Sequence, residues 1–188
     1  LRVEDVGGGT WLISEVTVTS SQMPTAWNTF DRSDFRLRYP AEFEFASGEA
    51  YGGANLDESL ARIRLPNGLF NSAGTNYVES YLVVSRSTRP EIVHTCMTYG
   101  DLAQPIQTTD LRSNGITLKV ATTTEVAAGN IYESELYRVS YQSRCYEMAI
   151  VVHTGQAAHY DPPVAEFERS FALEPLREVM RTFAFPLQ

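Results

Sequence analysis

The side chains best suited to covalent chemistry are those of two cysteines, Cys96 and Cys145, which lie far apart in the chain. Each stands at the edge of an apolar, strand-like run. They are 49 positions apart, so neither belongs to a Cys-x-x-Cys motif. An even number of widely spaced cysteines is typical of a disulfide in an exported protein. The sequence therefore predicts a Cys96–Cys145 disulfide, and the chain-entropy model values a loop of this size at about 4 kcal/mol.

Cys96 could instead be a nucleophile, because His94 precedes it by two positions. On a strand, residues two apart share a face, so the imidazole could reach the thiol. The disulfide is the favoured interpretation, since a second cysteine is present.

The histidines are His94, His153 and His159. A zinc site needs three or four convergent ligands. His153 and His159, with Asp161 or Glu147, could form only an opportunistic site, and their spacing matches no metal motif. We therefore expect no metal and no cofactor, and we expect His153 to end a strand and to bond a neighbouring carbonyl or carboxylate.

Glycosidase chemistry would require two carboxylates in one cleft. The candidates near predicted strands are Glu125, Glu133, Glu135 and Glu147, and Glu133 and Glu135 would share one sheet face. A solvated sheet face also carries charges, and we favour that explanation. The sequence contains no Gly-x-Ser-x-Gly elbow, no P-loop and no dinucleotide fingerprint, so no catalytic residue is assigned.

Composition limits the class of protein. The 188 residues are 43% hydrophobic and carry a net charge of −8, with a sequence pI of about 4.9. This composition predicts a folded chain and argues against nucleic-acid binding, because phosphate binding needs clustered Lys and Arg. No apolar run is long enough for a transmembrane segment. The chain begins at Leu1, and we expect any signal peptide to have been removed.

Apolar alternation predicts most of the elements to be strands. Asn114-Gly115 predicts a hairpin turn, and Gln142 to Arg144 a short antiparallel connection. Loops are expected at 23–32 and 48–54, and Pro90 slightly favours a short helix over an edge strand at 92–97. The predicted strands cover residues 10–20, 35–39, 43–45, 61–65, 77–85, 116–120, 131–141 and 145–153.

The C-terminal segment changes to helical spacing. Apolar stripes predict helices at 164–171 and 176–183, with a break near Leu173 and an extended tail at 183–186. Together, the elements predict an α+β domain in which a twisted antiparallel sheet is covered by helices, including a C-terminal amphipathic helix. An all-β sandwich with one peripheral helix is the alternative. Residues 1–9, with Gly7-Gly8-Gly9, are expected to form a flexible tether and 10–188 a single domain.

Several short segments together resemble a group of uncharacterised bacterial exported lipoprotein domains. The broader pattern, with Phe35-Arg36-Leu37-Arg38-Tyr39-Pro40 early and an amphipathic helix before Phe183-Ala184-Phe185, resembles the Mog1/PsbP-like superfamily. This resemblance implies a twisted antiparallel sheet flanked by helices and a protein that acts by binding other proteins. The segments that carry it are Gly74-Thr75-Asn76-Tyr77-Val78-Glu79-Ser80, Ala127-Ala128-Gly129-Asn130-Ile131-Tyr132-Glu133, Cys145-Tyr146-Glu147-Met148, His153, Tyr160-Asp161-Pro162 and Thr182-Phe183-Ala184-Phe185.

The polar residues of these motifs that stand within apolar runs form a candidate ligand patch, although Asn76 and Asn130 could instead serve turns or caps. The patch comprises Asn76, Asn130, Tyr132, Glu147, His153 and Tyr160. We expect a non-enzymatic, extracytoplasmic binding or accessory domain in the periplasm or at the cell surface, with another envelope protein as partner. The alternative is a small hydrolase with a deep cleft formed by His153 and a carboxylate. The sequence indicates no oligomeric state.

Overall fold

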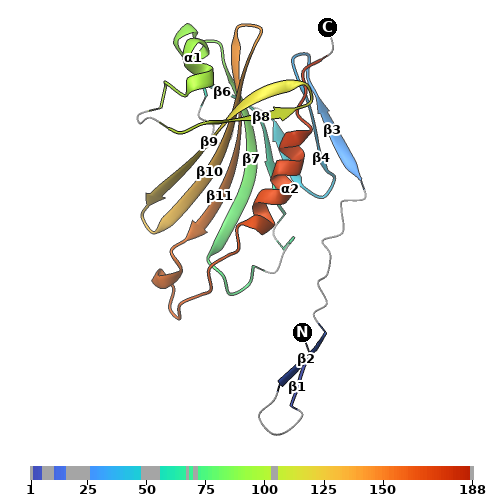
Figure 1. Ribbon diagram of the computed structural model, residues 1–188, viewed down its shortest axis with the longest axis vertical. Helices are drawn as coiled ribbons and strands as arrows, with labels where there is room; N and C mark the ends of the chain where they lie inside the picture. The colour runs from blue at the N-terminus through green and yellow to red at the C-terminus, as the bar shows by residue number, and fades with distance from the viewer. Residues whose placement is uncertain are drawn as a thin grey trace.

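The computed structural model describes residues 2–5, 11–15, 26–47, 56–66, 68–69, 72–102 and 106–186. Its centre is a twisted, seven-stranded antiparallel sheet, with helices packed on it (Figure 1). This arrangement confirms the predicted α+β class. The strands, in spatial order, are β5 (Glu44–Ser47), β6 (Glu58–Arg64), β7 (Tyr77–Ser87), β11 (Arg144–Gly155), β10 (Asn130–Tyr141), β9 (Ile116–Ala127) and β8 (Thr109–Ser113).

Two-residue turns connect β8, β9, β10 and β11. Asn114 and Gly115 have φ values of 49° and 77°, as a type I′ hairpin turn requires, so the Asn-Gly prediction is confirmed. Gln142 and Ser143 also have positive φ, at 49° and 55°, and connect β10 to β11. Tight turns of this kind set the cross-strand register from which the facing side chains follow.

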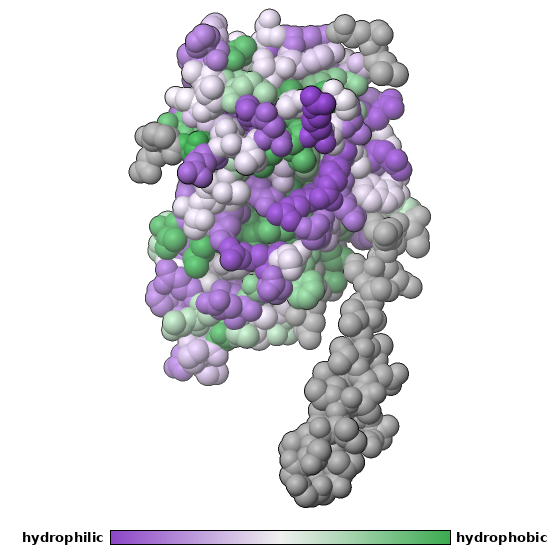
Figure 2. All heavy atoms as spheres, viewed as in Figure 1, coloured by the Kyte–Doolittle hydropathy of each residue, from purple (hydrophilic) through white to green (hydrophobic). Residues whose placement is uncertain are grey.

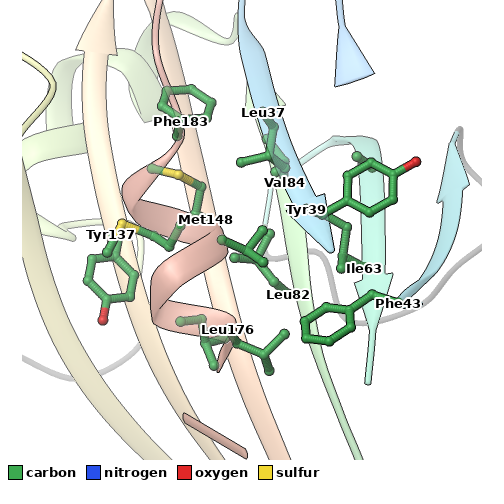
Figure 3. Packing of buried hydrophobic residues seen from close by; sticks show 14 of the residues in the cluster. Leu37, Tyr39, Phe43, Ile63, Leu82, Val84, Tyr137, Met148, Leu176 and Phe183 are labelled. Carbon is green, nitrogen blue, oxygen red and sulfur yellow. The ribbon is translucent and has the colours of Figure 1, made fainter. Parts of the chain in front are cut away.

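The amphipathic helix α2 (Ser170–Arg181) lies across one face of the sheet (Figure 1). Its buried residues are Ala172, Leu176, Val179 and Met180. Figure 3 shows Leu176 among Met148 and Leu82 of the sheet, in the main hydrophobic core. Burial of such side chains contributes about 25 cal/mol per Å² and is the main stabilising term.

A single helix replaces the two that the sequence predicts. The expected helix at 164–171 is wrong, because residues 164–169 are not helical, and the expected break near Leu173 lies inside α2. Thr75 and Ala165 form a parallel bridge, so the backbone before α2 bonds to the end of the sheet. Pro175 lies inside α2 and has no N–H to donate to the carbonyl of Phe171 four residues earlier, a residue that is 59% exposed.

Strands β3 (Trp27–Asp31) and β4 (Arg36–Pro40) form a separate hairpin beside the helix (Figure 1). The loop predicted at 23–32 is therefore wrong for 27–31, since β4 pairs with this segment and its aromatic side chains pack on the core. The tail at 183–186 is extended, as predicted. Arg36 N donates to Ala184 O at 2.8 Å, and Ala184 N donates back at 3.0 Å.

The short helix α1 (Pro90–Thr95) and the 3-10 turn η1 (Cys96–Thr98) lie at one end of the other sheet face. The helical alternative for 92–97 is therefore confirmed. The predicted disulfide is also confirmed: Cys96 and Cys145 are bonded, with a Cα–Cα distance of 5.6 Å, and both are fully buried beside Leu56 and Ile92.

Near the N-terminus, β1 (Arg2–Asp5) pairs antiparallel with β2 (Trp11–Glu15). Part of the segment predicted as a tether therefore forms a strand, and the remainder of 1–9 lies outside the described residues, as do 16–20 and the loop predicted at 48–54. The helices within the described ranges have 6 and 12 residues, and neither is long and apolar enough to span a bilayer.

Candidate functional site

The two faces of the sheet differ in what covers them. Met148 and Ile150 of β11 belong to the core under α2, so alternate residues of that strand, including Val151 and His153, face the other way. On that second face, α1 and η1 occupy one end. A separate cluster of Tyr81, Val83, Val151 and Tyr132 includes no helical residue. Side chains around this cluster are therefore available for a role other than packing a helix.

His153 lies between two cross-strand neighbours, Tyr132 of β10 and Glu79 of β7. The His153 and Tyr132 rings are stacked, with centroids 4.2 Å apart. His153 Nε2 donates to Asn130 Oδ1 at 2.9 Å. This agrees with the expectation that the imidazole ends a strand and bonds a neighbour, although the acceptor is an amide oxygen. The bond also sets the tautomer and leaves Nδ1 as the acceptor of the neutral ring.

Tyr160 reaches the same region from beyond the 3-10 turn η2 (Ala157–His159). A Cβ atom placed on Gly155 would lie 2.5 Å from Tyr160 Oη, so only glycine leaves room for this hydroxyl. Gly155 is two residues after His153 and pairs with Asn130, which puts all three on one face. We call Glu79, Tyr81, Asn130, Tyr132, His153 and Tyr160 the His153 patch. It unites four of the six predicted ligand residues.

Two arginines of β6 complete the charge distribution around the patch. Arg62 and Arg64 each lie 3.2 Å from Glu79 Oε2, and the Arg62 guanidinium carbon is 3.9 Å from the Tyr81 ring centroid. Cation–π contacts of this kind hold a ring and a charge in fixed relation. The sequence alone did not indicate these contacts, because only the β6–β7–β11 register brings these residues together.

The pKa of His153 lies below its ordinary value of 6.5, because partial burial disfavours the charged ring more than Glu79 favours it. The pKa of Tyr81 is raised by burial, which the nearby Arg62 only partly offsets. At neutral pH the patch therefore presents an uncharged imidazole and phenols beside the Glu79 carboxylate. Such a surface suits planar and hydrogen-bonding groups of a partner.

Asn76, a predicted ligand residue, has a structural role. Its Nδ2 donates to Gly155 O at 2.7 Å, and its Oδ1 accepts from Phe167 N at 2.7 Å. Its side chain is 6% exposed. Asn76 therefore connects the segment before α2 to the end of the sheet, consistent with the backbone-binding alternative that the sequence allows.

Glu147 also lies apart from the patch. It is fully buried and paired with Arg138 on β10. It precedes His153 by six residues on the same strand, a separation of about 20 Å at the usual rise per residue. The two residues therefore do not form a common cleft.

Of the four carboxylates considered for glycosidase chemistry, Glu133 and Glu135 share a sheet face, as predicted. Glu133 and Glu135 line adjoining grooves of about 250 and 290 Å³ between α2 and the outer strands. Both are ion-paired, Glu133 with Arg169 and Glu135 with Arg177. Figure 2 views this face and shows hydrophilic side chains crowding over it.

Burial alone would raise the pKa of Glu135, but hydrogen bonds from Arg177 and from Tyr137 Oη outweigh it, and the pKa is lowered. A general acid needs the opposite shift. Glu147 is buried under Arg138, and Glu125 is exposed on β9. These carboxylates therefore act as ion-pair partners or as surface charges.

The side chains considered for hydrolytic chemistry are engaged in other contacts. The Cys96 sulfur is bonded to Cys145, so the Cys96–His94 nucleophile does not exist. The carboxylate facing His153 is Glu79, whose Oε2 contacts two arginines. Grooves of about 200 to 420 Å³ occur at four other places, and His153 lines none of these four. Within the described ranges, no three His, Cys, Asp or Glu side chains converge on a metal position.

Comparison with known proteins does not assign a family. No protein-family model matches this chain, and no curated protein matches it. A crystal structure of a protein from Bacteroides thetaiotaomicron is similar over 82% of this chain and 46% of that one, with 12% identity and a TM-score of 0.48. This chain therefore spans about half the length of that protein. A similarity this distant carries no argument about function.

Proposed function

We propose that this protein is a non-enzymatic binding or accessory domain that works outside the cytoplasm and holds a partner protein of the cell envelope through the His153 patch. The observation that carries the proposal is the stacked Tyr132–His153 pair, half-buried on a part of the sheet where the adjoining buried cluster contains no helical residue. Aromatic residues with polar tips are enriched where proteins bind one another.

The proposed compartment is supported by the disulfide. Cys96 and Cys145 form a bond between η1 and β11, and such structural bonds persist mainly in oxidising compartments. The periplasm or the cell surface is the setting that we propose.

We also propose that the fold is of the Mog1/PsbP-like type and that the chain is akin to the exported lipoprotein domains whose motifs it resembles. The antiparallel sheet and the C-terminal helix α2 on one face support this assignment. So does the extended Phe183–Pro186 tail beside β4. Members of that superfamily act by binding other proteins, so a binding role is consistent with the proposed fold.

The test is affinity capture from the envelope fraction of the native host, with wild-type protein and patch variants compared side by side. We expect one envelope protein to bind the wild type and to bind Tyr132→Ala and Tyr160→Ala at least about tenfold more weakly, the loss typical of central interface residues. Glu178→Ala, an exposed position on α2, is the matched control and should bind like the wild type.

Equal capture by the wild type and both patch variants would refute the role of this surface. Far-UV circular dichroism of each variant ensures that weaker capture reports on binding and not on unfolding.

A further inference from the structure

Strand β9 pairs with another strand along only part of its outer edge. Residues 116–120 pair with β8, whereas 121–127 pair with β10 on the inner side and with no strand of the described chain on the outer side. Within this free stretch, Thr122 and Thr124 to Ala127 are exposed and Thr123 is partly exposed, and Val126 keeps 61% of its surface in water.

The direction of the free backbone groups follows from the turns. Residues that flank a two-residue hairpin turn form a hydrogen-bonded pair, and the pattern alternates along the strand. Ala127 flanks the β9–β10 turn, so alternate residues from Ala127 inward bond to β10. Thr122, Thr124 and Val126 therefore direct their N–H and C=O groups outward. This is an edge that can accept another strand.

Natural edges are usually protected by lysine, proline, a bulge or an inward-pointing charge. The free stretch, Ala121-Thr-Thr-Thr-Glu-Val-Ala127, has one charge, at Glu125, and no proline or lysine. Its pairing with β10 is regular throughout. An unprotected, β-branched edge whose inner side is regularly paired is suited to pairing with another strand.

We propose that two copies of this protein pair through this edge as an antiparallel dimer, with the two-fold axis at Thr124. The free stretch is symmetric about that residue, so the register uses all seven positions and stops where each copy's β8 begins. Thr124 then faces its own counterpart, in a hydrogen-bonded pair.

The same register suits the side chains. Val126 faces Thr122 of the second copy, which covers the exposed valine. Glu125 faces Thr123 of the second copy, so the two carboxylates are not opposite each other. A shift of the axis by one residue would place Glu125 against Glu125, and cross-strand like charges are destabilising. The side-chain pattern therefore favours pairing with itself in this register over the neighbouring one.

The inference goes beyond the proposed function. Because the axis is perpendicular to the joined sheets, both His153 patches face the same side. They are five strand spacings apart, or about 24 Å at the usual spacing. A dimer would therefore offer two patches to one partner surface.

Sedimentation velocity on the full chain, from micromolar to millimolar concentration, tests the proposal. We expect a monomer–dimer equilibrium that strengthens with added salt, because each copy carries a net charge of −8. Thr124→Lys places two ammonium groups face to face, and Thr124→Pro removes an outward N–H. We expect each to weaken the dimer at least about tenfold, which corresponds to about 1.4 kcal/mol.

Thr123→Lys is the matched control, since its ammonium group would face Glu125 of the second copy and the dimer should persist or strengthen. A wild type that stays monomeric over the whole range would overturn the proposal, as would a dimer that both Thr124 variants leave intact. A dimer lost equally in Thr123→Lys and Thr124→Lys would overturn the register. If a monomeric wild type captures an envelope protein through Thr124, the edge belongs to that partner and not to a second copy.

Discussion

Arg138 and Glu147 form an ion pair in which neither side chain has any exposed surface. Arg138 Nε donates to Glu147 Oε2 at 2.7 Å across the β10–β11 pair. The same guanidinium binds Asp101, and its central carbon lies 4.4 Å from the ring centroid of Tyr99. Through its contacts with Asp101 and Tyr99, Arg138 thus fastens the segment after η1 to the end of the sheet where the Cys96–Cys145 disulfide also lies.

Removing one partner of this pair should be costly. Arg138→Met leaves the Glu147 carboxylate buried without its cation, and we expect the free energy of unfolding to fall by about 3–5 kcal/mol. Adding Glu147→Leu to Arg138→Met should recover part of the loss, because the fully buried carboxylate is gone and only Asp101, which is partly exposed, still lacks its cation. Urea denaturation measures both.

Glu174→Gln is the control for that comparison, since Glu174 pairs with Arg177 on the exposed side of α2. Its effect should stay within about 0.5 kcal/mol. An Arg138→Met loss as small as the control's would contradict the assigned role of the buried pair.

The disulfide should contribute about 4 kcal/mol to the free energy of unfolding, as expected for a loop of 49 residues. The double variant Cys96→Ala/Cys145→Ala should lose about that amount in urea denaturation. Thiol titration of native, never-reduced protein should find no free sulfhydryl among these two residues. Two reactive thiols in that material would contradict the disulfide and remove the main support for an oxidising compartment.

His153 should make stability depend on pH. Its folded-state pKa lies below 6.5, so between that lowered value and 6.5 the unfolded chain binds more protons. The free energy of unfolding should therefore rise with pH through this window and gain nothing more from His153 above it. Urea denaturation of the wild type and His153→Gln between about pH 5 and 8 isolates the effect.

Glutamine keeps an N–H donor for Asn130 but does not titrate, so the difference between the two curves belongs to His153. If both proteins have the same slope through the window, the imidazole is not desolvated in the folded state.

Asn76 should contribute to the stability of the fold through its two buried hydrogen bonds. Asn76→Ala removes the bonds to Gly155 O and Phe167 N at a buried site, and each partner left unsatisfied costs about 1–3 kcal/mol. Thermal denaturation should show a clear drop in Tm. Asn28→Ala, at an exposed position of β3, should change Tm little. A similar small change in both variants would mean that water replaces the Asn76 bonds.

The sequence determined most strands of the main sheet and two of its turns, because alternation and the Asn114-Gly115 dipeptide act through neighbouring residues. It did not indicate β3 or β8 as strands. It also indicated the Cys96–Cys145 bond, since two widely spaced cysteines leave one pairing. By contrast, one helix formed where spacing predicted two, because Asn76 and Thr75 bind the backbone before α2 to the sheet, a contact between distant parts of the chain.

The candidate site was likewise predictable only in part from the sequence. Polar residues within apolar runs were visible in the sequence, but which of them meet depends on strand register. Register placed Asn130, Tyr132 and His153 together with Glu79, and it put Glu147 under Arg138 at the far end of the same strand. A shift of one residue moves a side chain to the other face of a sheet, so only the tertiary structure could decide which residues share the surface.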